Sequence, residues 1–248
     1  MPRDDWKKLP RLYVTEALRK GQHVPLDTAQ QHYLTHVMRR SAGSQLLLFN
    51  GQDGEWLATL EPRSKNSAAA ACTEQTRPQT PTLDLRLLFA PIKREHLDYL
   101  IQKASELGVA HLQPVLTQHT VAPRLNPSRL HAIAREAAEQ CERLTLPTLG
   151  AAMPLDIALS QWGNDQPLFA CLESGTAQPL ATAMSGKTAA TSAAILTGPE
   201  GGFSTDEMEL IRRHPSTIPV SLGPRILRAD TAALAALAVW QALLGDGR

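Results

Sequence analysis

The chain has few cysteines and no long apolar run. Its three cysteines, Cys72, Cys141 and Cys171, are far apart and form no C-x-x-C pair, which argues against a zinc site or a disulfide framework. The most apolar stretch, residues 232–244, contains Gln241 and is shorter than the roughly 20 residues that a membrane-spanning helix requires. No apolar segment follows the charged N-terminal residues, as it would in a secretory signal. These absences predict a cytoplasmic protein that needs no membrane and no metal.

The chain also has almost no net charge, since its formal charge is +1. The charge is unevenly distributed, however. Residues 1–40 carry eight Lys and Arg against four Asp and Glu, a net charge of +4, so the remaining residues carry −3. A basic segment favours contact with a polyanion, because phosphate contacts supply most sequence-independent affinity for nucleic acids. A solvated charged face would give the same pattern, and charge alone does not decide between the two.

The first part of the chain is typical of short strands and turns. Within residues 46–60, two apolar stretches flank Asn50-Gly51 and Asp53-Gly54, both of which favour hairpin turns. We therefore predict a small β domain over residues 1–73. The polar, proline-containing residues 74–82 are predicted to form a linker.

Residues 83–248 alternate between apolar strands and amphipathic helices, which predicts an α/β domain with a mainly parallel sheet. The last helix, expected from about Thr231 to Leu244, is apolar nearly all round, so we expect it to be buried in the core or against a second subunit. The strand candidates are residues 83–90, 111–116, 168–173, 193–197 and 218–222.

The sequence LTGPEGGFS, residues 196–204, concentrates glycine directly after an apolar strand. Ser204 and Glu207 form a capping-box pattern, so residues 198–202 are predicted to be the turn between a strand and a helix. Residues 221–228 make a second glycine-proline turn after the next strand. Ligands of open α/β sheets bind at this edge, and glycines let them approach the main chain. A tight connection without a ligand would use similar residues, and the spacing matches neither a dinucleotide fingerprint nor a P-loop.

Four blocks in order carry a resemblance to a known family. They are IQKASELGV, EAAEQCERLTLP, LTGPEGGFS and VSLGPRILRADTAALAAL, beginning at residues 101, 136, 196 and 220. They closely resemble the RsmE family of ribosomal RNA uridine-N3 methyltransferases in the SPOUT superfamily. The likeness extends over essentially the whole chain, including HYLTHVMRR and LFNGQDGEW.

The resemblance implies the fold, the cofactor and the partners. It implies a PUA-like β-barrel followed by a SPOUT α/β domain with a trefoil knot, which periodicity could not have predicted. It also implies a homodimer that uses S-adenosylmethionine to methylate uridine N3 in 16S ribosomal RNA of the small ribosomal subunit. Two alternatives stay open: a SPOUT methyltransferase with another target such as the ribose 2′-oxygen, and a non-enzymatic RNA-binding assembly protein.

Site residues are carried over by position. The implied catalytic residues are Arg228, Glu200 and Asp230, although Glu200 could simply hold its turn and Asp230 could be the N-cap of the last helix. Ala229-Asp230 stands where the family usually has Thr-Glu, so we give Arg228 more weight. The predicted RNA contacts are Arg11, Arg39 and Arg40. The predicted cofactor contacts are Leu172, Glu173, Thr197, Gly198, Glu200, Gly201, Gly202, Leu222, Gly223, Arg225, Ile226 and Leu227.

Overall fold

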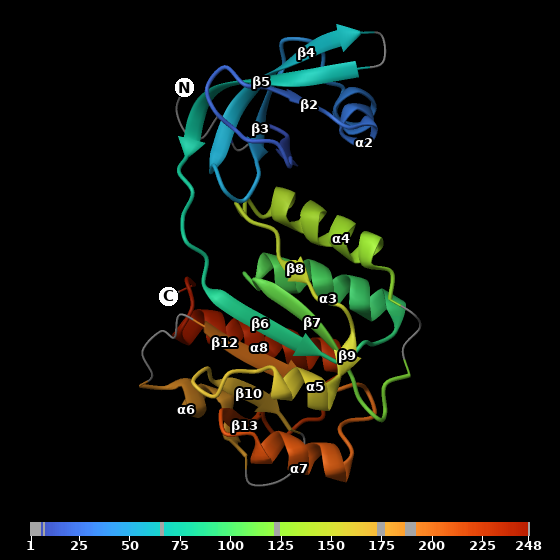
Figure 1. The fold of residues 1–248 in the computed structure, drawn as a ribbon, viewed down its shortest axis with the longest axis vertical. Helices are drawn as coiled ribbons and strands as arrows, with labels where there is room; N and C mark the ends of the chain where they lie inside the picture. The colour runs from blue at the N-terminus through green and yellow to red at the C-terminus, as the bar shows by residue number, and fades with distance from the viewer. Residues whose placement is uncertain are drawn as a thin grey trace. The chain divides into compact units, whose positions relative to one another are not determined.

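The computed structural model (Figure 1) describes residues 6, 8–64, 67–121, 125–172, 177–186 and 192–247. The chain forms two units. The first comprises Met1–Pro81 and Ala138–Leu146, and the second comprises Thr82–Ala137 and Pro147–Arg248.

The first unit is built on a five-stranded sheet in the order β1-β3-β4-β5-β2. Its strands are β1 (Arg11–Tyr13), β2 (His23–Pro25), β3 (Gln45–Phe49), β4 (Glu55–Ser64) and β5 (Ser67–Arg77). All neighbours are antiparallel except β1 and β3, which run parallel. Between β2 and β3 the chain forms α2 (Thr28–His32) and the π-helix η1 (Tyr33–Val37). The buried core of this unit includes Val24, Leu34, Leu46 and Leu48.

The predicted hairpin is the connection between β3 and β4. Gly51 and Gly54 have φ angles of +82° and +75°, which a glycine adopts readily. At Gly54 a side chain would also collide with the main chain, since a Cβ atom would lie 2.2 Å from the carbonyl oxygen of Arg77. Strand β5 continues to Arg77, so the linker predicted over residues 74–82 begins later than expected.

The second unit contains an eight-stranded parallel sheet in the order β11-β13-β10-β12-β6-β7-β8, with β9 pairing to β7. The strands are β6 (Asp84–Phe89), β7 (His111–Leu116), β8 (Thr148–Leu149), β9 (Met153–Pro154), β10 (Leu168–Cys171), β11 (Gln178–Pro179), β12 (Ser192–Thr197) and β13 (Thr217–Ser221). The predicted parallel sheet is confirmed. In the register, Phe89 of β6 lies beside Thr197 of β12, so these carboxyl ends reach the same edge.

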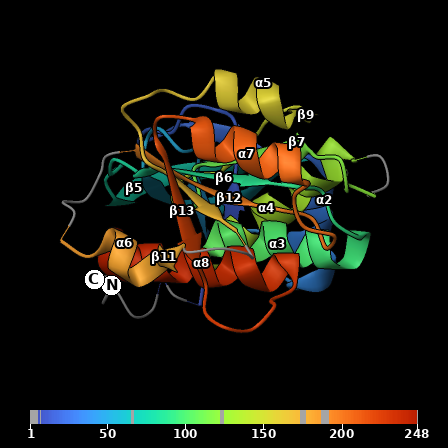
Figure 2. The same cartoon turned by 90° about the horizontal axis from the view of Figure 1, so that it is seen from below.

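Helices cover both faces of this sheet (Figure 2). On one face lie α3 (Arg94–Glu106), α6 (Leu180–Met184) and α8 (Ala229–Leu243), while α5 (Leu155–Ser160) and α7 (Thr205–Arg213) cover the other. The helix α4 (Pro127–Gln140) runs from the second unit into the first. Helix α8 begins two residues earlier than predicted, and its Ala233, Ala236, Leu237 and Trp240 are buried. Within the described part of the chain, every helix is too short or too polar to cross a membrane.

Candidate active site

The glycine-rich turn after β12 has a fixed geometry. Ser204 caps α7, because its hydroxyl accepts the N–H of Glu207 and the Glu207 carboxylate accepts the N–H of Ser204. The predicted capping box is therefore confirmed. Before it, the N–H of Gly202 donates to the carbonyl of Pro199 over 3.0 Å, and Gly202 has a φ of +68°. The turn is thus closed by its own main chain and by the start of the helix.

Two residues of the loop after β7 form hydrogen bonds to the same turn and to the helix that follows it. Nδ1 of His119 lies 3.1 Å from the carbonyl oxygens of both Gly201 and Gly202. The N–H of Gln118 donates to the Glu207 carboxylate over 2.7 Å. Because the backbone of the turn has these partners, its position depends on residues far away in the sequence.

The second glycine-proline turn lies between β13 and α8. The N–H of Gly223 donates to the Ser221 hydroxyl over 3.2 Å, and Gly223 has a φ of +109°, a conformation that favours glycine. The segment after β10 lies alongside, since the N–H of Leu172 donates to the carbonyl of Val220 over 3.1 Å. Three neighbouring strands of the sheet therefore end around one space.

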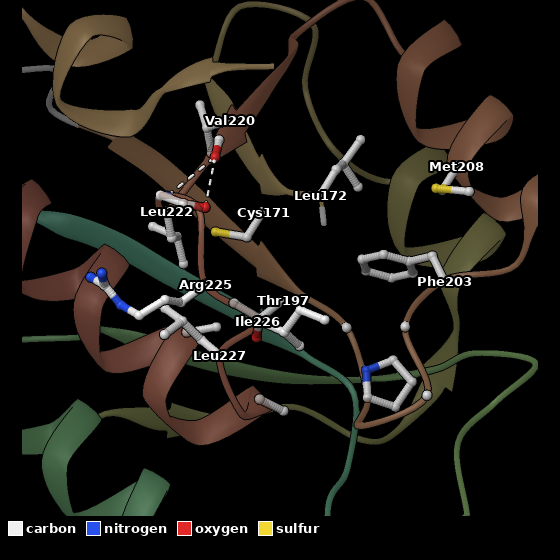
Figure 3. Close-up of a pocket in the computed structure, with 18 of the residues that line it drawn as sticks. Cys171, Leu172, Thr197, Phe203, Met208, Val220, Leu222, Arg225, Ile226 and Leu227 are labelled. Atoms are coloured by element: carbon white, nitrogen blue, oxygen red, sulfur yellow. Dashed lines mark hydrogen bonds between the residues drawn. The ribbon is translucent and has the colours of Figure 1, made fainter. Parts of the chain in front are cut away.

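That space is a cavity of about 240 Å³. Figure 3 shows Phe203 and Met208 on one side of it and Arg225, Ile226 and Leu227 on the opposite side. The side chains around it are mostly apolar, and the two turns bring main-chain N–H and C=O groups to its wall. A planar heterocycle with a short polar chain suits such a site, because apolar walls take the ring and a few polar groups orient it. The residues present therefore fit S-adenosylmethionine.

Ten of the twelve predicted cofactor residues line this cavity. Of the other two, Glu173 lies outside the described residues, and Glu200 is exposed and absent from the cavity wall. Phe203 and Met208 are among the wall residues that the prediction did not include. They occupy the positions of a hydrophobic staple around the start of α7, a helix-capping signal that gives no indication of a pocket.

Cys171 at the end of β10 also lines the cavity. Burial raises the pKa of its thiol to about 12. The thiolate is the nucleophilic form of cysteine. Because this thiol stays protonated at neutral pH, it does not attack an electrophilic ligand in the pocket.

The predicted catalytic residues lie near the cavity in different surroundings. Arg228 is exposed and is the N-cap of α8, so the alternative that Asp230 caps this helix is wrong. Asp230 lies in the first turn, and its Oδ2 is 2.9 Å from Nδ1 of His96, a residue that the sequence did not suggest. The exposed Glu200 has a long contact of 3.5 Å from its Oε1 to the N–H of Lys93.

Arg11 does not have the surroundings of an RNA contact. It is 8% exposed, and its Nε donates to the Glu55 carboxylate over 2.7 Å. Its Nη atoms donate to the carbonyls of Ala138, Glu139 and Arg143, all within the first unit. The prediction that Arg11 contacts RNA is therefore corrected, because its donors are used inside the protein.

Arg39 and Arg40 follow η1 at the surface. Arg39 is exposed and has a φ of +51°, which is uncommon outside glycine. Arg40 is half-buried, and its Nε has no hydrogen-bond partner in the described part of the chain.

In the same part of the chain, no three His, Cys, Asp or Glu side chains come together as metal ligands do.

Comparison with known proteins identifies the family. The profile of the RNA methyltransferase domain matches residues 78–241, and that of the RNA methyltransferase PUA domain matches residues 26–71. The ribosomal RNA small subunit methyltransferase E of Rickettsia conorii is 33% identical over 232 residues, covering 93% of this chain and 94% of its own.

Two solved structures share the fold. One is the Neisseria gonorrhoeae ribosomal RNA small subunit methyltransferase E bound to S-adenosyl methionine, with a TM-score of 0.84 and 28% identity over 97% of this chain and 100% of its own. The other is a Legionella pneumophila protein in complex with the cofactor SAM, with a TM-score of 0.81 and 28% identity over 95% of this chain and 98% of its own. The predicted fold class, a SPOUT α/β domain with a mainly parallel sheet preceded by a PUA-like domain, is confirmed. The chain therefore belongs to the ribosomal RNA small subunit methyltransferase E family.

Proposed function

We propose that this protein transfers the methyl group of S-adenosylmethionine to N3 of a uridine in 16S ribosomal RNA, acting in the cytoplasm as a homodimer. The observation that carries the proposal is the cavity at the carboxyl edge of the parallel sheet, whose wall contains ten of the residues expected to bind the methyl donor. The family membership supports the same reaction.

The residues around the cavity have the properties that this reaction requires. S-adenosylmethionine supplies an electrophilic methyl group on a positively charged sulfur. The apolar wall keeps water away from the reacting atoms, and the fixed turns hold the two reactants in one geometry. Ile226 is 88% exposed beside the cavity, an apolar side chain that a second subunit would cover.

The uridine has its own requirement, because its N3 carries a proton. This proton must leave before the nitrogen becomes a good nucleophile, and the resulting negative charge spreads onto the two flanking carbonyl oxygens. Arg228 has a planar, permanently charged guanidinium that suits these oxygens, and we assign it their stabilisation. Glu200 and Asp230 are the two predicted acidic residues on the segments next to the cavity.

RNA binding is assigned to the first unit. A base inside a folded RNA must leave its stack to reach a reaction centre, so the surrounding RNA has to be held by other contacts. Because the donors of Arg11 are used inside the protein, Arg39 and Arg40 are the remaining proposed phosphate contacts.

The test is a methyl-transfer reaction with labelled S-adenosylmethionine and small ribosomal subunits that lack the modification, followed by nucleoside mass spectrometry. We expect N3-methyluridine. Label in a ribose 2′-oxygen or in another base would contradict the proposed target. A protein that binds the RNA without methylating it, and that does not bind S-adenosylmethionine in equilibrium dialysis, would instead be a non-enzymatic assembly protein.

A further inference from the structure

His96 on α3 and Asp230 on α8 form a hydrogen-bonded pair at the edge of the candidate active site. They are 134 residues apart in sequence, and Nδ1 of His96 lies 2.9 Å from Oδ2 of Asp230. Asp230 directly follows Ala229, which lines the cavity. On the other helix, the N–H of Lys93, three residues before His96, reaches the Glu200 carboxylate in the glycine-rich turn. Asp230 therefore adjoins the cavity wall along the chain, and the start of α3 that carries His96 contacts the turn after β12.

The two side chains of the pair differ in solvent exposure and in the number of polar atoms that already have a hydrogen-bond partner. Both carboxylate oxygens of Asp230 are engaged, since Oδ1 also accepts the N–H of Thr231 over 2.8 Å, and the side chain is 13% exposed. The His96 side chain is 40% exposed, and its Nε2 has no hydrogen-bond partner in the described part of the chain. The imidazole is therefore the group of the pair that can meet a substrate.

A carboxylate next to one ring nitrogen determines the tautomer of a histidine. Because the Asp230 oxygen can only accept, the neutral ring keeps its proton on Nδ1, and Nε2 is left with a free lone pair. A buried carboxylate also stabilises the imidazolium that forms when Nε2 takes up a proton. This arrangement is that of a general base and the residue that orients it.

We propose that His96 is the general base that removes the N3 proton of the target uridine, and that Asp230 is the positioning residue that orients it. This inference rests on the proposed function. It gives Asp230, one of the predicted catalytic residues, the role of orienting the base instead of removing the proton itself.

The proton transfer balances with the methyl transfer. The N3–H bond breaks, its electron pair stays on N3, and the proton moves to Nε2 of His96. The N3 pair then forms a bond to the methyl carbon while the pair of the carbon–sulfur bond returns to sulfur, which becomes a neutral thioether. The positive charge moves to the imidazolium beside Asp230, and water takes the proton after the product leaves.

Other charged groups lie on the elements around His96. Among the described residues, Asp230 is the one that hydrogen-bonds to the imidazole. The charged side chains at the start of α3 are Lys93, Arg94, Glu95 and Asp98, of which Asp98 pairs with Arg129 of α4. Glu200 lies in the turn after β12 and Arg228 directly before α8, while Lys103 and Glu106 lie at the far end of α3 and pair with each other.

The test compares His96→Gln and Asp230→Asn with the wild type in single-turnover methylation of small ribosomal subunits, at saturating S-adenosylmethionine and across a range of pH. His131→Gln is the matched control, because it replaces an exposed histidine on α4 with the same residue. Isothermal titration with S-adenosylmethionine measures binding separately. ¹⁵N NMR of the imidazole nitrogens reports the tautomer of His96 independently of activity.

We expect His96→Gln to lower the rate about 100-fold or more, the usual contribution of a general base, while the affinity for S-adenosylmethionine stays within twofold of wild type. The wild-type rate should fall in acid, where an imidazole is protonated, and level off at higher pH. The His96→Gln rate should instead keep rising with pH as hydroxide replaces the base. Nδ1 should carry the proton in the wild type, and Asp230→Asn should lose this preference and part of the activity.

The results separate the two proposals. A His96→Gln rate within threefold of an active wild type would overturn the role of His96 and leave the proposed function standing. A slow variant that binds S-adenosylmethionine much more weakly in the titration, or that keeps the plateau of the wild-type pH profile, would also overturn it, because His96 would then be structural. A wild type that makes no N3-methyluridine would overturn both.

Discussion

Replacing Glu55 with Gln should destabilise the first unit, because it removes the buried negative charge that pairs with Arg11 and Arg77. Glu55 is 4% exposed. Its Oε2 accepts hydrogen bonds from Arg11 and Arg77, each over 2.7 Å. Its Oε1 accepts from Arg77 over 3.0 Å and from the Thr76 hydroxyl over 2.8 Å. Glutamine has nearly the same shape, so the substitution changes charge and hydrogen bonding with little change in packing.

The size of the effect follows from what remains after the substitution. Removing one partner of a buried ion pair typically costs about 3–5 kcal/mol, because the other charge stays buried without compensation. The amide NH₂ of Gln would also face a guanidinium donor. Since the Arg77 side chain is 36% exposed, water solvates part of its charge. We therefore expect a loss near the lower end of that range, about 3 kcal/mol in the free energy of unfolding of the first unit.

The pH dependence gives a second, independent criterion. Burial alone would raise the pKa of Glu55, but the hydrogen bonds from Arg77 and the charge of Arg11 outweigh it and lower the pKa below its ordinary value. A carboxyl with a lowered pKa in the folded state stabilises the protein above its unfolded pKa, and this contribution is lost as the pH falls through the folded pKa. The difference between wild type and Glu55→Gln should therefore shrink in acid.

Hydrogen exchange measured by mass spectrometry on peptides from β3, β4 and β5 gives the opening free energy of this unit alone. The control is Glu61→Gln, because the pair between His23 and Glu61 is 49% and 44% exposed and should contribute at most about 0.5 kcal/mol. A Glu55→Gln loss below about 1 kcal/mol at neutral pH, or a loss that stays constant on acidification, would refute the reasoning.

Two further predictions concern glycines. A Cβ atom at Gly198 would lie 3.0 Å from a ring atom of Phe203 in the cavity wall, so Gly198→Val should force the ring to move and weaken S-adenosylmethionine binding about tenfold in isothermal titration. Gly163→Val should bind normally, since a Cβ there meets only ordinary contacts. Gly54→Ala should lower the unfolding free energy by more than about 2 kcal/mol in urea denaturation, because positive φ adds to a collision with the main chain. Gly43→Ala, with positive φ and open space, should cost about 1 kcal/mol, and equal losses at the two sites would contradict the collision.

Features confined to a few neighbouring residues could be predicted from the sequence. The capping box at Ser204, the hairpin at Gly51 and Gly54, and the glycine turns after two strands are all found where the pattern indicates them. Their physical cause is local, because a backbone angle or a cap depends on residues within one turn of each other. The cavity residues could be predicted as well, since the resemblance supplied their positions and parallel strands bring such turns to one edge.

Side-chain partners far apart in the sequence could not be predicted. Arg11 is a basic residue in a basic segment, and nothing near it indicates that carbonyls more than 120 residues later will take its donors. His96 lies on α3 beside the buried Leu97, and its pairing with Asp230 depends on how α3 and α8 pack on the same face of the sheet.

The sequence by itself determined the five longer strands of the parallel sheet, the turns after two of them, the family, and ten of the residues in the cavity wall. Only the tertiary structure decided which charges are buried, and that the Asp230 carboxylate is paired with His96. The physical reason is that periodicity and capping act over a few residues, whereas ion pairs and hydrogen bonds between distant side chains depend on strand order and helix packing. For this reason Arg11 changes from an RNA contact to a buried structural residue, and Asp230 becomes the partner of His96.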